Sequence, residues 1–146
     1  MAKRFKLQAV LKYRQSLEDQ AQQVLATSLQ KQSHLKTQLQ EQKQKLKRLD
    51  RELKIRQIDG LTIAAMDLYE SQIQHHRRLI EDIQNQLQRL DQQVDSERKE
   101  LLYAARERQV MEKLKDKQEA EYQQELSRKE RAMLDEISLR SKGHDS

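Results

Sequence analysis

The feature that most constrains this chain is the near-absence of residues that interrupt helices. Between Lys3 and Ser141 the sequence contains no proline, and its only glycine is Gly60. Because glycine and proline mark turns most strongly, the pair Asp59-Gly60 is the one strong turn signal. Gly143 stands where a last helix would stop. The sequence therefore predicts two very long helices that fold back on each other near Gly60.

The composition favours exposed helices over disorder. Charged residues make up 36% of the chain, aromatic residues 3%, and 23 residues are Gln. This leaves too few large apolar side chains for a wide core, as in disordered segments and in long exposed helices. Leu, Gln, Glu, Lys, Arg and Ala are abundant, and all of them are good helix formers. We therefore predict an all-α fold, a long antiparallel two-helix coiled-coil hairpin.

The charges are divided unevenly between the two arms. Residues 1–57 contain 14 Lys or Arg and 5 Asp or Glu, whereas residues 58–146 contain 15 and 19. The first arm is therefore basic and the second is slightly acidic. Because parallel pairing of two copies would place like charges side by side, this bias favours pairing within one chain. We expect a monomer.

The second arm carries a regular coiled-coil pattern. Apolar residues repeat every seven positions in two registers, which is an a/d seam sustained over roughly five heptads. The first register contains Ile73, Ile80, Leu87, Val94 and Leu101, and the second contains Ile83, Leu90, Glu97, Ala104 and Met111. Thr62 is the expected N-cap of this helix, with Leu61 and Met66 at the positions of a hydrophobic staple.

The first arm shows a less regular spacing of threes and fours. Its predicted seam runs through Val10, Arg14, Leu17, Ala21, Val24, Ser28, Lys31 and Leu35, and then through Leu39, Gln42, Leu46, Leu49 and Leu53. Two successive intervals of four around Leu35 predict a stutter, which locally relaxes a supercoil. Because polar residues lie on this seam, we expect a first arm that is mobile or depends on a partner.

These patterns predict one coiled-coil domain over residues 1–146, with helices over about 3–57 and 62–141 and a turn over about 58–61. A hairpin centred near residue 59 or 60 places Leu17 opposite Leu102, and Leu46 opposite Ile73. The first arm then ends near position 115, so residues 115–140 form a C-terminal overhang of ~40 Å. A lone helix of that length is marginal in water, so it either frays or is held by another protein.

No pattern in the sequence indicates catalysis, a cofactor or a metal. There is no Cys, two glycines cannot form a phosphate-binding loop, and the adjacent His75 and His76 point about 100° apart on a helix. No apolar run approaches the ~20 residues that a membrane span needs. We therefore expect a non-enzymatic, cytoplasmic chain without direct membrane insertion.

Two other functions stay open from the residues alone. One is a nucleic-acid-binding coiled coil that would use a basic run of the first arm. Because this run winds around the helix and lacks interleaved aromatic residues, we expect no nucleic acid as partner. The run consists of Lys43, Lys45, Lys47, Arg48, Arg51, Lys54 and Arg56. The other is a structural dimer in which the arms pair between two chains.

Four stretches of the sequence carry a family resemblance. They are RFKLQAVLKYR at residues 4–14, VMEKLKDK at 110–117, EY at 121–122 and LDEI at 134–137. They resemble the flagellar export protein family FliJ. The length, the charge and the single central turn are also similar, so the resemblance spans the whole chain. It implies an antiparallel coiled coil similar to the rotary-ATPase γ subunit.

The resemblance further implies partners and a location. Members of this family are understood to insert into the hexameric flagellar export ATPase, to promote its assembly, to link it to the membrane export gate protein, and to take part in recycling export chaperones. This places the chain at the cytoplasmic face of the inner membrane. The residues expected to face the ATPase are Phe5, Leu7, Leu11, Val110, Leu114 and Lys117. Those expected to face the export gate are Tyr69, Ile73 and His76.

Overall fold

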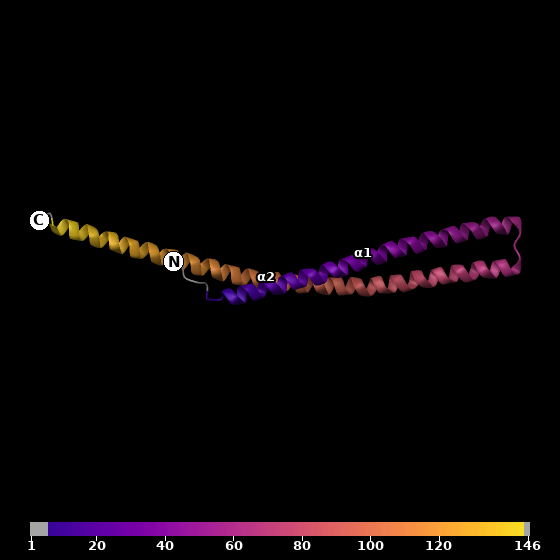
Figure 1. Ribbon diagram of the computed structural model, residues 1–146, viewed down its shortest axis with the longest axis horizontal. Helices are drawn as coiled ribbons and strands as arrows, with labels where there is room; N and C mark the ends of the chain where they lie inside the picture. The colour runs from indigo at the N-terminus through magenta and orange to yellow at the C-terminus, as the bar shows by residue number, and fades with distance from the viewer. Residues whose placement is uncertain (1–5, 145–146) are drawn as a thin grey trace. The chain divides into compact units, whose positions relative to one another are not determined.

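The computed structural model describes residues 6–144, which form two helices joined by a short connection (Figure 1). Helix α1 spans Gln8–Asp59 and helix α2 spans Ile63–His144, where the sequence suggested about 3–57 and 62–141. The two helices run in opposite directions and pack against each other, so the predicted all-α two-helix hairpin is confirmed. Phe5, one of the residues expected to bind the ATPase, lies outside the described residues.

The reversal at the end of α1 uses the predicted turn residues. Gly60 has a φ of 98°, a left-handed conformation that a residue with a Cβ adopts only with strain. The hydroxyl of Thr62 accepts a hydrogen bond from the amide of Ala65 at 3.2 Å, which confirms Thr62 as the N-cap of α2. Leu61 and Met66 are both half-buried, as a hydrophobic staple requires.

The chain divides into two compact units, which we describe separately. The turn unit contains residues 21–100, and the terminal unit contains the two ends of the chain up to residue 20 and from residue 101. In the turn unit the second part of α1 lies along the first part of α2 (Figure 1). In the terminal unit the start of α1 lies along the middle of α2.

The predicted seam of α2 is correct in the turn unit. Tyr69, Ile73, Ile83, Leu90 and Val94 are the buried apolar residues there, and Ile80 and Leu87 are half-buried between them. All of them continue one alternation of threes and fours, which keeps a single face of α2 directed at α1.

The predicted seam of α1 is wrong at three positions. Val24 is 50% exposed and Val10 is 38% exposed, and Lys31 is also exposed. The neighbouring residues form the seam instead, and it alternates threes and fours without the predicted stutter. This seam passes through Leu11, Arg14, Glu18, Ala21, Leu25, Ser28, Gln32, Leu35, Leu39, Gln42, Leu46, Leu49 and Leu53, all of which are buried or half-buried.

The pairing register also differs from the predicted one. The prediction placed Ser28 opposite residue 91, but its hydroxyl hydrogen-bonds to Glu97 at 3.0 Å. Glu18 was expected opposite residue 101, and its partner is Arg108. Leu102, the predicted neighbour of Leu17, is 51% exposed. Away from the turn, α1 therefore meets α2 between one and two helical turns further along than expected.

This register moves the start of the overhang. The backbone amide of Lys6 donates a hydrogen bond to Oε1 of Gln118 at 3.4 Å, and Tyr122 is half-buried. Every residue from 123 to 143 is exposed. The exposed part of α2 therefore begins about two turns later than the predicted position 115.

Candidate partner-binding surfaces

The seam of the terminal unit is held together largely by charged side chains. Arg108 donates to Glu18 on α1 and, at 2.8 Å, to Glu112 on its own helix. These hydrogen bonds, that of Glu18 first, raise the pKa of Arg108, so its guanidinium stays charged. Arg14 pairs with Glu107 at 3.8 Å. Among the described residues of this unit, only two large apolar ones, Leu11 and Met111, are buried.

Apolar side chains of the terminal unit lie beside the seam and are exposed. On each helix they occupy positions one residue before a seam residue, and in an antiparallel coil these positions border the same side of the pair. We call this surface the apolar flank. It consists of Val10, Tyr13, Tyr103, Val110 and Leu114, which are between 38% and 62% exposed. Exposed apolar side chains gathered on one side of a helix pair are a candidate surface for contact with another molecule.

The residues predicted to bind the ATPase divide into two groups. Val110 and Leu114 belong to the apolar flank, and the exposed Lys117 continues it along α2. Leu7 lies directly before α1, one turn ahead of the first seam residue Leu11, and is 42% exposed. Leu11 is only 3% exposed, so its side chain holds the two helices together instead of facing outward.

Sequence reasoning missed Tyr103 as a member of this surface. It lies one heptad before Val110, and that spacing alone could have found it once the seam at Ala104 and Met111 was known. The exposed part of α2 adds a second set of apolar residues. It consists of Leu126, Met133, Leu134, Ile137 and Leu139.

The residues predicted to face the export gate lie mainly inside the coil. Tyr69 and Ile73 are 9% and 6% exposed, and the guanidinium of Arg56 lies 5.6 Å from the Tyr69 ring centre. His76 is half-buried, and its Nδ1 lies 2.7 Å from Oε1 of Gln42 on α1. These three side chains therefore stabilise pairing near the turn, and Leu68 beside them is 62% exposed.

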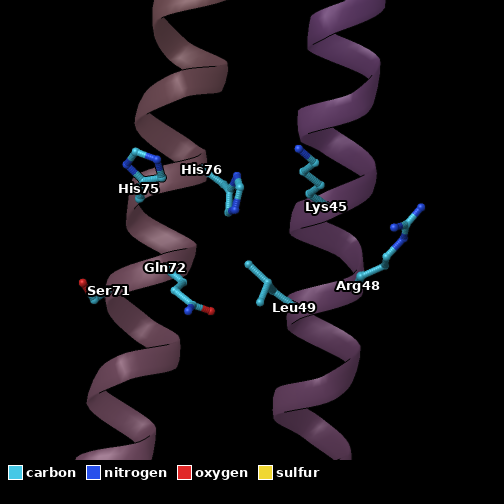
Figure 2. A pocket seen from close by; sticks show the side chains of 7 residues that line it. All are labelled: Lys45, Arg48, Leu49, Ser71, Gln72, His75 and His76. Carbon is cyan, nitrogen blue, oxygen red and sulfur yellow. The ribbon is translucent and has the colours of Figure 1, made fainter.

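An open groove lies next to His76 in the turn unit. It has a volume of about 590 Å³ and is lined by residues of both helices. Figure 2 shows Leu49 and His76 directed into the space between the helices, while Arg48 extends outward from α1. Lys45 and His75 are exposed at its rim. The groove is open and basic, without the enclosed set of acid and base groups that catalysis uses.

Between residues 6 and 144, no three His, Asp or Glu side chains are grouped as a metal site would require. Neither helix, over the same residues, has a stretch long and apolar enough to cross a bilayer.

Comparison with known families identifies the family of the chain. The family model described as flagellar FliJ protein matches residues 3–144, which is nearly the whole chain. Neither the curated proteins nor the solved structures give a significant match. The chain therefore belongs to the FliJ family, a component of the flagellar protein export apparatus.

Proposed function

We propose that this chain is a non-enzymatic stalk that inserts its terminal unit into the hexameric flagellar export ATPase, promotes ring assembly and couples the ring to the export gate. The apolar flank is the observation that carries this proposal, because five exposed apolar side chains gather beside a seam of charged residues. Such side chains can enter apolar sockets of a ring, while the basic residues around them steer the approach to acidic loops.

The ion pairs in the seam of the terminal unit suit this role, because they hold α1 and α2 together weakly enough for a partner to change how the two helices pair. Partly exposed ion pairs contribute only ~0.2–1 kcal/mol each, whereas burying one Leu or Val side chain contributes ~1.5–3 kcal/mol. Insertion into a ring that buries the apolar flank would therefore stabilise the terminal unit more than its own ion pairs do. The exposed apolar residues of the overhang could be buried against a partner in the same way.

For the export gate, we propose a contact on the turn unit near Leu68. Because Tyr69 and Ile73 are buried, they would act by holding α2 in place, and exposed neighbours such as Leu68 and His75 would make the contact. Recycling of export chaperones, a location at the cytoplasmic face of the inner membrane and the absence of enzymatic activity are further parts of this proposal.

The test of the stalk is to add the protein to the cognate export ATPase and to measure ring formation and ATP turnover. Val110→Glu with Leu114→Glu places two charges on the apolar flank, and we expect at least a tenfold loss of stimulation, about 1.4 kcal/mol. The matched control is Ile58→Glu with Ile63→Glu, which changes two residues near the turn that are more than 80% exposed.

The proposed gate contact is tested with Leu68→Glu. This variant should reduce binding to the export gate and leave ATP turnover unchanged. If the wild-type chain changes neither ring formation nor turnover, the stalk proposal is wrong. Equal losses in the flank variant and in the turn control would also contradict it, because the effect would then not be located on the apolar flank.

A further inference from the structure

The turn unit contains two grooves that repeat each other. The first, described above, is lined on α1 by Lys45, Arg48 and Leu49. The second has a volume of about 350 Å³ and is lined on α1 by Lys31, His34 and Leu35. Each residue of the second set lies fourteen positions before its counterpart in the first. Both sets therefore occupy the same heptad positions, about 21 Å apart along α1.

The facing helix repeats in the same way. Three α2 residues of the first groove, Gln72, His75 and His76, correspond at an offset of fourteen to Gln86, Arg89 and Leu90 of the second. Ser71 lines only the first groove and Gln93 only the second. Corresponding positions thus pair Lys with Lys, Leu with Leu, Gln with Gln, and Arg with His at two positions. The exception is His76, whose counterpart is Leu90, so the two grooves share their basic rims but differ at this one position of their floors.

Each groove has an apolar floor and a basic rim. The floor of the first groove contains Leu49, which is half-buried. The floor of the second contains Leu35, which is half-buried, and Leu90, which is 8% exposed. Lys31, Lys45 and Arg89 are exposed at the rims. None of the residues that line the two grooves is Asp or Glu. The nearest carboxylates at the same heptad positions are Glu41 and Asp82, in the heptad between the grooves.

We propose that this side of the turn unit docks an acidic amphipathic helix of a partner protein, which lies along the coil and adds a third helix to it. Apolar residues of that helix would pack on Leu35, Leu49 and Leu90. Two groups of Asp or Glu, two heptads apart, would meet the two basic rims, and neutral or basic residues between them would face Glu41 and Asp82. This surface lies in the turn unit and includes His75 of the proposed gate contact. It goes beyond the proposed function because it names the chemistry of the docked partner.

The pattern favours a helix over a nucleic acid for two reasons. A phosphate backbone carries its charge continuously, so it would meet the carboxylates of Glu41 and Asp82 between the two basic rims. The grooves also lack Phe, Tyr and Trp, the large aromatic side chains on which the bases of a single strand would stack. A helix can match both the alternating charge and the leucine floors, because its side chains repeat with the heptad period of the coil.

The probe for this test is a fluorescent synthetic helix of about four heptads, roughly 42 Å long. It carries leucines on one seam, glutamates beside them in its two outer parts, and lysine between these parts. Binding to the full chain is measured by fluorescence anisotropy. We expect the half-length helix, which reaches only one groove, to bind at least tenfold more weakly, because the second contact becomes intramolecular in the longer one.

Two matched variants locate the binding. Lys31→Glu with Lys45→Glu reverses one charge at each groove, and we expect it to raise Kd at least tenfold. Lys36→Glu with Lys43→Glu makes the same change of net charge at exposed positions elsewhere on α1, and its Kd should stay within about twofold. Circular dichroism should show unchanged helicity in both, because all four lysines are exposed.

The other outcomes overturn the proposal. An equal rise of Kd in both variants would mean that only net charge matters, and absence of binding to the long helix would mean that there is no such surface. A third arm uses single- and double-stranded oligonucleotides of similar length. If they bind more tightly than the helix and depend on the same two lysines, the surface serves nucleic acid instead.

Discussion

At the scale of single residues, Glu97 is the most unusual position. It lies on the seam of α2, is 7% exposed, and its Oε1 accepts hydrogen bonds from Ser28 and Gln93, both at 3.0 Å. Its Oε2 is buried without a hydrogen-bond partner within the described residues. A buried carboxylate in a coil costs stability, and a polar pair of this kind specifies the register in which two helices meet.

This pair makes a prediction about stability. Ser28→Ala removes one of the two donors to the Glu97 carboxylate, so the free energy of unfolding should fall by about 1–2 kcal/mol. Ser28→Ala with Glu97→Leu replaces the whole polar pair by apolar side chains, and the free energy of unfolding should rise by about 1–3 kcal/mol. Urea unfolding followed by circular dichroism measures both.

The opposite signs of the two results form the test. If the double variant is less stable than the wild type, Glu97 contributes more to the coil than its hydrogen bonds indicate. Loss of a single pairing register in the double variant, seen as several distances between spin labels at Leu35 and Leu87 within the turn unit, would separately show that the polar pair sets the register.

At the scale of elements, the sequence predicted α2 better than α1 for a physical reason. The seam of α2 is strictly apolar at Ile73, Ile83, Leu90 and Val94, so periodicity alone identifies it. In α1 the observed seam contains the polar residues Ser28 and Gln32. In addition, two apolar residues are adjacent in the pairs Val10-Leu11 and Val24-Leu25, so periodicity fits either member of each pair. Only the facing helix decides between such neighbours.

The register needed information that the turn alone does not contain. A hairpin centred on Gly60 sets where the arms begin to meet, and near the turn the prediction was close, because Gln42 contacts His76 instead of residue 77. Further along, the interleaving of the two seams decides which residues face each other. Arg108 therefore meets Glu18 more than a turn beyond the predicted position.

The turn itself allows a prediction with a matched control. Gly60→Ala forces a Cβ into a φ of 98°, although no atom lies within 4 Å of that Cβ, so the cost is one of backbone strain alone. We expect the free energy of unfolding to fall by about 1–2 kcal/mol. Gly143→Ala, at a helical position near the end of α2 with equally open space, should leave the urea midpoint unchanged. Equal effects at the two glycines would contradict the role given to Gly60.

At the scale of the whole molecule, the two units differ in what stabilises them. Of the seven buried apolar residues between residues 6 and 143, five belong to the turn unit and two to the terminal unit. Since burial contributes more than partly exposed ion pairs do, the turn unit should resist local opening better. The basic and apolar residues at the ends of the helices allowed part of the candidate site to be predicted from the sequence. The burial of Leu11, Tyr69 and Ile73 could not be predicted, because it depends on the register of the two helices.

This difference can be measured by hydrogen exchange of the backbone amides. Amides of α1 and α2 in residues 30–90 should exchange at least about tenfold more slowly than those in residues 8–20 and 101–118. Sedimentation should give a mass near 17.5 kDa, which tests the expected monomer under the same conditions. Uniform protection in both units would show that the ionic seam of the terminal unit is as strong as the apolar seam of the turn unit.

The strict alternation of threes and fours in both helices restricts how such a chain can change its length over time. An insertion in one helix displaces every later residue of that helix from its partners on the facing helix. The pairing is kept only when seven residues are added there and seven more are added at the matching place in the other helix. Growth and shortening of the paired region must therefore occur as coordinated double events. Residues 123–143, which are exposed throughout, are free of this rule and are the place where single insertions are tolerated best.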